Sequence, residues 1–384
     1  MSEPGLIVIG SGAAGIGAAE AYREHRNDVP VRILTADVDA PYMRPPLSKE
    51  FLRGESDDVG VHTPEWLAER KLELSTGTRV DGIDVRDRVV TAAGRRFAYS
   101  ELIVACGSHP RTLPVPGGDR ALSLRSLRDA EELRRVAEQS DSAVVVGAGF
   151  IGCEAAASLA MRGVSVTLVA PGQVPQQKRF GVEVGERLRS MVEDAGARFV
   201  GGVRVQEITA EGVVLDNGVT VDTDLVVAAT GVTPDSALAG PAGLSVEQAR
   251  IVVDADMRTA QPGVFAAGDV ALAANVAAGR SIAVEHWQDA ADQGAVAGRR
   301  AAGIEAAWAQ VPGFWSTIGT ATVKYHAWGD GYDRCRLIDH RDGFTAWYES
   351  DGVAVGVLTH NADDDYELGE ELIRVGESAP VAMS

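Results

Sequence analysis

Two short glycine-rich segments have the spacing that proteins use to hold phosphate groups. Residues 10–15 read GSGAAG and residues 147–152 read GAGFIG, so each has the pattern GxGxxG. In such a loop the first glycine permits a tight turn, the second lets the backbone approach a pyrophosphate, and the third lets helix and strand pack closely. The pyrophosphate then lies at the positive amino end of the helix. The sequence therefore predicts two dinucleotide-binding sites.

The segments around each loop predict the elements that position it. An apolar run typical of a strand precedes each loop, LIVIG before the first and AVVV before the second, and an alanine-rich helical stretch follows. Further strand-like runs are VRIL at 31–34 and VSVTLVA, which ends at Ala170. Strands that alternate with helices are typical of a parallel sheet covered by helices. We therefore expect an α/β fold with two Rossmann-like nucleotide-binding domains.

In each predicted nucleotide-binding domain, the residues after the second strand help to determine which nucleotide is bound. Asp37 follows the first unit's second strand and is the candidate for a ribose hydroxyl. Ala170 stands where an NAD-preferring site usually carries an acid. Lys178 and Arg179 could instead meet a 2′-phosphate, or they could be a solvated basic pair. NADH and NADPH both stay open, with a slight preference for NADPH.

Composition bounds the class of protein. The chain has 384 residues, 45% of them hydrophobic, which suits two or three domains of a globular protein. We see no apolar run of roughly 18 residues and no basic leader, so we expect no membrane partner and a cytoplasmic location. The net charge of −19 argues against nucleic acid as a partner. Cys106, Cys153 and Cys335 are far apart, so we expect neither a disulfide framework nor a metal site.

Four segments resemble one family, the FAD-dependent, nicotinamide-linked ferredoxin reductases of oxygenase systems, within the glutathione-reductase-like fold. They are PYMRPPLSK at 41–49, LIVACGSHPR at 102–111, GVFAAGDV at 263–270 and VPGFWS at 311–316. The resemblance covers nearly the whole chain and weakens after about residue 310. It implies FAD at the first loop and NADH or NADPH at the second. From residue 317 the chain looks rather like apoptosis-inducing-factor-like flavoproteins.

The resemblance also implies individual site residues. Lys49 and Glu154 are the expected catalytic pair behind flavin N5, where the lysine charge would favour the reduced anionic flavin. Read without the resemblance, Glu154 could be a surface glutamate on the helix's first turn, stabilised by the helix dipole. The expected FAD-binding residues are Gly10, Gly12, Ala13, Ala14, Gly15, Asp37, Arg44, Lys49, Val80, Ala105, Gly107, Arg111, Gly268, Asp269, Trp287 and Trp315. The expected NAD(P)-binding residues are Gly147, Gly149, Phe150, Ile151, Gly152, Glu154, Lys178, Arg179 and Gly231.

The expected domain division follows from the two loops and the resemblance. Residues 1–112 and 232–310 form a discontinuous FAD-binding domain, and residues 113–231 form the NAD(P)-binding domain. Aromatic residues crowd together after about residue 311 with polar residues between them. That pattern predicts a small α+β domain over 311–384, with an antiparallel sheet and a short helix in the acidic tail.

The missing cysteines bear on the electron acceptor. Disulfide reductases of this fold carry a CxxxxC pair early in the chain, and another branch carries a cysteine where this chain has Met43. Electrons should therefore leave the flavin singly, to a ferredoxin-like protein, and without a thiol relay. The late basic residues could surround its docking face: Arg299, Arg300, Lys324, Arg334, Arg336 and Arg341. The alternatives are an apoptosis-inducing-factor-like, NADH-responsive binding protein, or an oxidase or diaphorase using oxygen or quinones. We expect a monomer or a homodimer.

Overall fold

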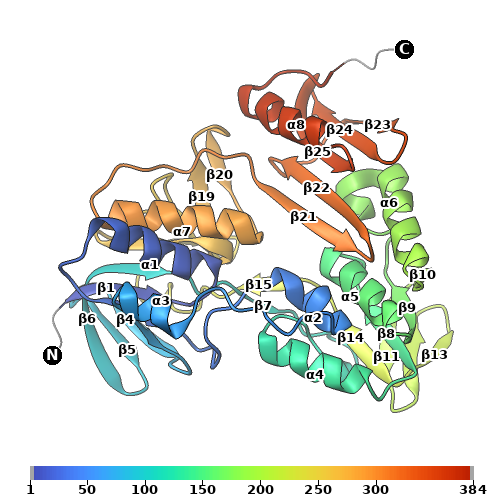
Figure 1. Ribbon diagram of the computed structural model, residues 1–384, viewed down its shortest axis with the longest axis horizontal. Helices are drawn as coiled ribbons and strands as arrows, with labels where there is room; N and C mark the ends of the chain where they lie inside the picture. The colour runs from blue at the N-terminus through green and yellow to red at the C-terminus, as the bar shows by residue number, and fades with distance from the viewer. Residues whose placement is uncertain (1–3, 381–384) are drawn as a thin grey trace. The chain divides into compact units, whose positions relative to one another are not determined.

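Figure 1 shows the computed structural model, which describes residues 4–380. By their mutual contacts these residues form two units. The first contains the chain up to residue 43, residues 60–109 and residues 233–314. The second contains residues 44–59 and 110–232 and the chain from residue 315 onwards. The short strands β7 (Ser108–Pro110) and β15 (Val232–Pro234) contain two of the positions at which the chain passes between units.

The first unit is built on a sheet with the strand order β3-β2-β1-β6-β5-β4, and β18 also pairs with β6. Strands β1, β2, β3 and β18 join the sheet by parallel pairing, whereas β4 and β5 extend it as an antiparallel ribbon. All five residues of β1 are buried, as expected for a parallel strand covered on both faces. The bounds are β1 Gly5–Ile9, β2 Val31–Leu34, β3 Leu72–Ser75, β4 Val80–Asp84, β5 Val89–Ala92, β6 Arg95–Val104 and β18 Val264–Ala266.

Two helices of the first unit, α1 (Ala13–His25) and α7 (Trp287–Ala301), run side by side (Figure 1). Glycines allow this close packing, because a Cβ at Gly294 would lie 2.1 Å from the Ala14 carbonyl oxygen. A Cβ at Gly298 would lie 2.2 Å from the Ala18 carbonyl oxygen. The unit also contains α3 (Pro64–Glu69), η3 (Gly268–Val270) and a small sheet of β16 (Val246–Glu247), β17 (Arg250–Val253), β19 (Ala271–Asn275) and β20 (Arg280–Ile282).

The second unit repeats the strand–loop–helix theme. Its parallel sheet has the order β10-β9-β8-β14, and α5 and α6 pack against it. Helix α4 begins with a capping box, in which Ser126 and Asp129 bind each other's backbone N–H groups. The bounds are α4 Leu127–Ala137, β8 Ser142–Val146, α5 Phe150–Met161, β9 Ser165–Val169, α6 Gln177–Asp194, β10 Arg198–Val200 and β14 Leu225–Ala228. An antiparallel sheet of β11 (Val205–Ile208), β12 (Gly212–Leu215) and β13 (Thr220–Asp222) and the short η2 (Gly118–Arg120) complete this part.

The proline-rich segment belongs to the second unit by its contacts. It forms η1 (Pro45–Ser48) and the single-turn helix α2 (Glu50–Arg53), and both pack against α4 and α5. Arg162, which follows α5, donates a hydrogen bond of 3.1 Å to the Leu52 carbonyl oxygen. The segment that the resemblance places beside a flavin is therefore held on the helix that follows the second glycine loop.

The chain after residue 312 forms the antiparallel sheet and terminal helix that the sequence predicts. The strand order is β21-β22-β25-β24-β23, and α8 packs against β22 and β25. Trp347 and Tyr348 are 1% exposed and fill the core of this part, whereas Trp315 is 45% exposed. The bounds are β21 Gly313–Ile318, β22 Ala321–Ala327, β23 Arg334–Asp339, β24 Phe344–Ser350, β25 Val353–His360 and α8 Asp363–Val375.

The expected fold class is confirmed, because each glycine loop connects a parallel strand to a helix in a mixed α/β architecture. The three-domain division stays a prediction. Over residues 4–380 no helix has both the length and the apolar character needed to cross a membrane.

Candidate functional site

The first glycine loop is sterically restricted to glycine at two positions. Gly10 has φ +106°, and a Cβ there would lie 2.2 Å from the Ala105 carbonyl oxygen. A Cβ at Gly15 would lie 2.0 Å from the Gly10 carbonyl oxygen. Helix α1 begins after Gly12 with no side-chain cap and no acid in its first turn. Its amino end therefore presents backbone N–H groups that can donate hydrogen bonds to an anionic phosphate.

The second loop has the same construction. Gly147 has φ +108°, and a Cβ at Gly152 would lie 1.8 Å from the Gly147 carbonyl oxygen. Helix α5 begins after Gly149, again without a side-chain cap or an acid in its first turn. A Cβ at Gly149 would meet nothing within 4 Å, so open space lies in front of this residue. Both loops are therefore shaped and polarised for a pyrophosphate.

Hydrogen bonds connect the predicted ribose ligand Asp37 to the first loop. Thr35 Oγ1 accepts from Ser11 Oγ at 3.1 Å and from the Asp37 backbone N–H at 3.2 Å. Tyr42 donates its hydroxyl to Asp37 Oδ2 at 2.7 Å. The carboxylate is thus oriented at the end of β2, on the same side as the loop.

The second predicted carboxylate of this unit, Asp269, also lies near the start of α1. A Cβ at Gly268, its neighbour, would lie 3.0 Å from the Ala14 Cβ. Gly268 N–H donates to Gln293 Oε1 of α7 at 2.9 Å, and Ser108 Oγ donates to Asp269 Oδ2 at 2.5 Å. The structure therefore brings together the predicted residues 10–15, 37 and 268–269 within one unit.

The predicted catalytic pair is present in the second unit. Lys49 Nζ lies 3.3 Å from Glu154 Oε2, and the two side chains are 7% and 3% exposed. Ser48 Oγ donates to the same oxygen at 2.5 Å. Ser316 Oγ and the Thr317 backbone N–H donate to Oε1 at 2.7 Å and 3.3 Å. Glu154 is therefore a buried carboxylate with four hydrogen-bond donors among residues 4–380, and its interpretation as a surface glutamate is wrong.

The lysine has donor capacity beyond this pair. An ammonium has three N–H groups, and within residues 4–380 Lys49 Nζ has one hydrogen-bond acceptor, Glu154. A buried ammonium of this kind is suited to meeting negative charge on a bound group. This spare capacity and the two uncapped helix amino ends fit a flavin dinucleotide and a nicotinamide dinucleotide.

The surroundings of the second loop bear on nucleotide preference. Ala170 is 6% exposed and follows β9, so no carboxylate side chain stands at that position. The Arg179 guanidinium lies over the Tyr325 ring, 4.9 Å from its centroid. Lys178 is exposed, as is Ile151, while Phe150 packs against Phe180 with centroids 5.8 Å apart.

The remaining predicted site residues lie in both units. Arg111 Nε donates to the Val232 carbonyl oxygen at 2.9 Å, and its backbone N–H donates to the Gly231 carbonyl oxygen at 3.0 Å. The structure thus joins Arg111 and Gly231, which were expected to serve different cofactors. Val80 and Ala105 are buried, Gly107 has a left-handed backbone, Arg44 precedes η1 and Trp287 begins α7. Their contacts with a cofactor stay predictions.

Sequence reasoning missed the neutral partners of the predicted carboxylates. Ser48 and Ser316 lie inside the PPLSK and FWS segments, so their motifs could have indicated them. Gln293 lies in the middle of α7 with no local signal. Its role at Gly268 follows only from the packing of α7 against η3.

The cysteines have no arrangement for redox chemistry. All three are free thiols, and Cys153 is buried inside α5. Desolvation by burial raises the pKa of the Cys106 thiol to about 12, although the residue keeps some exposed surface. Burial likewise raises the pKa of Cys153. Both thiols are therefore uncharged at neutral pH and poor nucleophiles.

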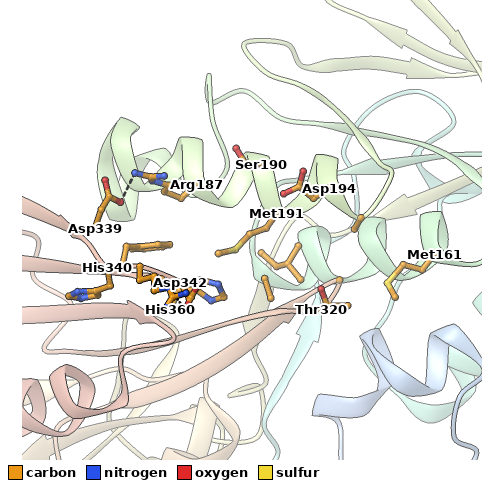
Figure 2. A pocket seen from close by; sticks show the side chains of 17 residues that line it. Met161, Arg187, Ser190, Met191, Asp194, Thr320, Asp339, His340, Asp342 and His360 are labelled. Atoms are coloured by element: carbon orange, nitrogen blue, oxygen red, sulfur yellow. Dashed lines mark hydrogen bonds and ion pairs between the residues drawn. The ribbon is translucent and has the colours of Figure 1, made fainter.

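A separate hollow of about 590 Å³ lies between α6 and the C-terminal sheet (Figure 2). Met161, Met191 and Phe344 contribute apolar side chains, and Arg187 and Asp339 form an ion pair of 2.6 Å at its rim. None of the predicted site residues lines it. Over residues 4–380 no group of three or more histidine, cysteine or acidic residues is arranged to hold a metal ion.

Comparison with known families matches residues 4–294 to the sequence pattern described as pyridine nucleotide-disulphide oxidoreductase. The chain belongs to this family. As a member it is a flavoprotein with a pyridine-nucleotide site, in agreement with the two glycine loops.

Three relatives of this chain illustrate the range of similar proteins. Apoptosis-inducing factor 3 of Mus musculus is 30% identical over 389 residues, which cover 98% of this chain and 64% of the relative. The chain thus spans less than two thirds of that relative's length. The ferredoxin–NAD(+) reductase component of the anthranilate 1,2-dioxygenase system of Burkholderia cepacia is 34% identical over 326 residues, 82% of this chain and 80% of the relative. The crystal structure of the ferredoxin reductase for the CYP199A2 system from Rhodopseudomonas palustris has a TM-score of 0.93 and 30% identity, over 98% of this chain and 96% of that one.

Proposed function

We propose that this protein is an FAD-dependent reductase that takes a hydride from NADH and passes electrons singly to a ferredoxin-like protein. One observation carries the proposal. Two glycine loops each lead into a helix without a side-chain cap, in a chain whose cysteines form no thiol pair. A hydride donor and a flavin account for both loops. The absence of a thiol pair favours an acceptor that takes electrons from the flavin directly.

The chain's own residues would bind and position the reactants. The amino ends of α1 and α5 bind the two pyrophosphates, and Asp37 and Asp269 accept hydrogen bonds from hydroxyl groups of FAD. The flavin, when bound, supplies the chemistry of accepting a hydride and releasing single electrons. Lys49 would supply a positive charge that favours the growing negative charge of that step, and Glu154 is its partner, with Nζ and Oε2 3.3 Å apart.

For the donor, we propose NADH over NADPH. The related reductase from Burkholderia cepacia is named for NAD(+). The Arg179 guanidinium lies over Tyr325, an arrangement that would have to change before it could meet a 2′-phosphate. Comparison of flavin reduction by equal concentrations of NADH and NADPH tests this choice, and faster reduction by NADPH would contradict it.

A second candidate function is a binding protein whose contacts respond to reduction by NADH. The observation in its favour is the similarity to apoptosis-inducing factor 3 over 98% of the chain. Such a protein would keep its reduced flavin for long periods, whereas a ferredoxin reductase would be reoxidised at once by its acceptor. An oxidase or diaphorase would instead be reoxidised rapidly by oxygen or a quinone without a protein partner.

Anaerobic stopped-flow spectroscopy of the FAD-loaded protein distinguishes these functions. We expect NADH to reduce the flavin rapidly, and an added [2Fe–2S] ferredoxin to reoxidise it faster than oxygen or a quinone does. Slow reoxidation by every acceptor would favour the binding function.

The substitution K49M should slow flavin reduction by about tenfold or more, since it removes a charge that stabilises the reduced state. An unchanged rate would remove Lys49 from the mechanism.

A further inference from the structure

The buried carboxylate of Glu154 has two kinds of partner, and they differ in strength. A carboxylate accepts about four hydrogen bonds, two at each oxygen. Three of the four donors here are uncharged: the hydroxyls of Ser48 and Ser316 and the backbone N–H of Thr317. The fourth is the ammonium of Lys49.

The distances rank these donors. The two hydroxyls lie 2.5 Å and 2.7 Å from the carboxylate oxygens, within the range of strong hydroxyl–carboxylate hydrogen bonds. Lys49 Nζ lies 3.3 Å away, which is longer than the 2.7–2.9 Å or so of a close ammonium–carboxylate contact. The oppositely charged partner is therefore one of the two loosest contacts of this carboxylate, together with the Thr317 N–H.

The uncharged donors are themselves held in position. Ser158, one helical turn after Glu154 on α5, donates its hydroxyl to the Ser48 carbonyl oxygen at 2.7 Å. The Thr317 hydroxyl lies 2.9 Å from that of Thr322, which ties β21 to β22. Ser48 and Ser316 are 2% and 1% exposed, so water does not compete for their hydroxyls. The carboxylate is thus fixed from η1 and from β21.

We infer that Ser48 and Ser316 are positioning residues that hold Glu154 as an ionised, fixed carboxylate whether or not Lys49 is bound to it. Lys49 is then the movable member of the pair. It can shift toward negative charge on a bound group without leaving a buried carboxylate that lacks hydrogen bonds, a situation that is strongly destabilising. This inference rests on the proposed function for its use, but the geometry of Glu154 does not depend on NADH.

Infrared spectroscopy of the FAD-loaded protein at neutral pH, without NADH, tests the inference directly. A protonated buried carboxyl has a carbonyl band that a carboxylate lacks, and E154Q identifies the contribution of Glu154. K49M should show no such band, because three uncharged donors still stabilise the ionised form. K49M/S48A/S316A should show it. A band in K49M alone would overturn the inference, since Lys49 would then be what keeps Glu154 charged.

The kinetics of flavin reduction in serine variants provide a second, independent test. S316A should lower the limiting rate of flavin reduction by about tenfold, as expected for loss of one hydrogen bond to a charged group, with the NADH dissociation constant within twofold. S316T, which keeps the hydroxyl, should restore the rate to within about threefold. S48A removes the donor to the other oxygen and is an independent second variant. Unchanged limiting rates in both alanine variants would overturn the inference.

The infrared and kinetic tests together distinguish failure of the inference from failure of the proposed function. If NADH does not reduce the unsubstituted protein, the proposed function is wrong. The infrared comparison remains valid in that case, because it involves no turnover.

Discussion

Two glycines of the second loop are required for different physical reasons. Gly147 has φ +108°, and a Cβ there would lie 2.4 Å from the Ala229 carbonyl oxygen, so a side chain would distort the backbone. Gly149 has φ −73° and open space in front of it, so a side chain would fit the protein itself. The nucleotide that we propose for this loop would give Gly149 a reason to lack a side chain.

We therefore expect G149A to fold normally and to bind FAD with unchanged affinity, but to bind NADH about tenfold more weakly. The added methyl group would occupy the space through which a pyrophosphate approaches the backbone. Titration of the FAD-loaded protein with NADH measures the effect. G147A is the matched comparison and should lower the melting temperature as well. Tight NADH binding by G149A would show that the nucleotide lies elsewhere.

The cysteines allow a second prediction at the scale of single residues. The pKa of the Cys106 thiol is raised to about 12 by desolvation, so the unreactive protonated form dominates below that pH. We expect iodoacetamide to label Cys106 far more slowly at about pH 8 than it labels the unfolded chain, as measured by mass spectrometry. C106A should keep its rate of flavin reduction. Rapid labelling together with loss of activity would instead indicate a thiol relay.

At the scale of elements, the packing of α7 on α1 supports the first glycine loop. The contact is so close at Gly294 that a methyl group would lie 2.1 Å from the Ala14 carbonyl oxygen, in the first turn of α1. In the proposed function, the same turn presents its N–H groups to a pyrophosphate. Displacement of α1 should therefore affect stability and flavin binding together.

We expect G294A to destabilise the protein by about 1–3 kcal/mol through overpacking and to weaken FAD binding. Thermal unfolding and flavin release on dilution measure the two effects. G82A is the control, because a Cβ at Gly82 in β4 would meet nothing within 4 Å. If G294A retains FAD as well as G82A does, the spacing between α1 and α7 does not control the site.

Elements also show where sequence reasoning was incomplete. The PYMRPPLSK segment was recognised by its own residues, but its partner element was not. The structure packs η1 and α2 on α4 and α5, and so joins this segment to the second glycine loop's helix. Such long-range packing depends on the shape of both surfaces and leaves no local pattern in the chain.

At the scale of the whole molecule, the net charge affects the approach of the acidic partner that we propose. The net charge is −19, and several of the late basic residues that could form a docking face are paired with acids. Arg300 pairs with Asp256 at 2.6 Å, and Lys324 pairs with Asp363 at 2.8 Å. Arg334 lies 4.0 Å from Glu349, and Arg341 lies 4.0 Å from Asp342. These ion pairs reduce the positive field that would steer an acidic ferredoxin.

We expect the rate of reduction of an acidic ferredoxin to increase as salt rises from about 0.02 M to about 0.15 M. Added salt shortens the Debye length to about 8 Å and screens the repulsion between two acidic proteins. Steady-state assays with ferredoxin measure the effect, and ferricyanide reduction under the same conditions controls for changes at the flavin. A rate that falls steadily with salt would indicate a local basic docking site.

The sequence by itself determined what depends on local chemistry. Spacing alone indicated both phosphate loops, because a turn that forbids side chains requires glycine. Alternating strands and helices indicated the α/β class, and Lys49 and Glu154 were identified by resemblance and found paired.

Only the tertiary structure decided how the carboxylates are held. Glu154 lies 106 positions from Ser48 and 162 from Ser316, and burial brings them within hydrogen-bond distance. The same holds for Gly268 with Gln293. A buried polar group must find a donor or acceptor, and which residue supplies it is decided by the packing of distant elements. That is why the resemblance identified the charged pair, whereas the hydrogen bonds that hold Glu154 follow only from the packing.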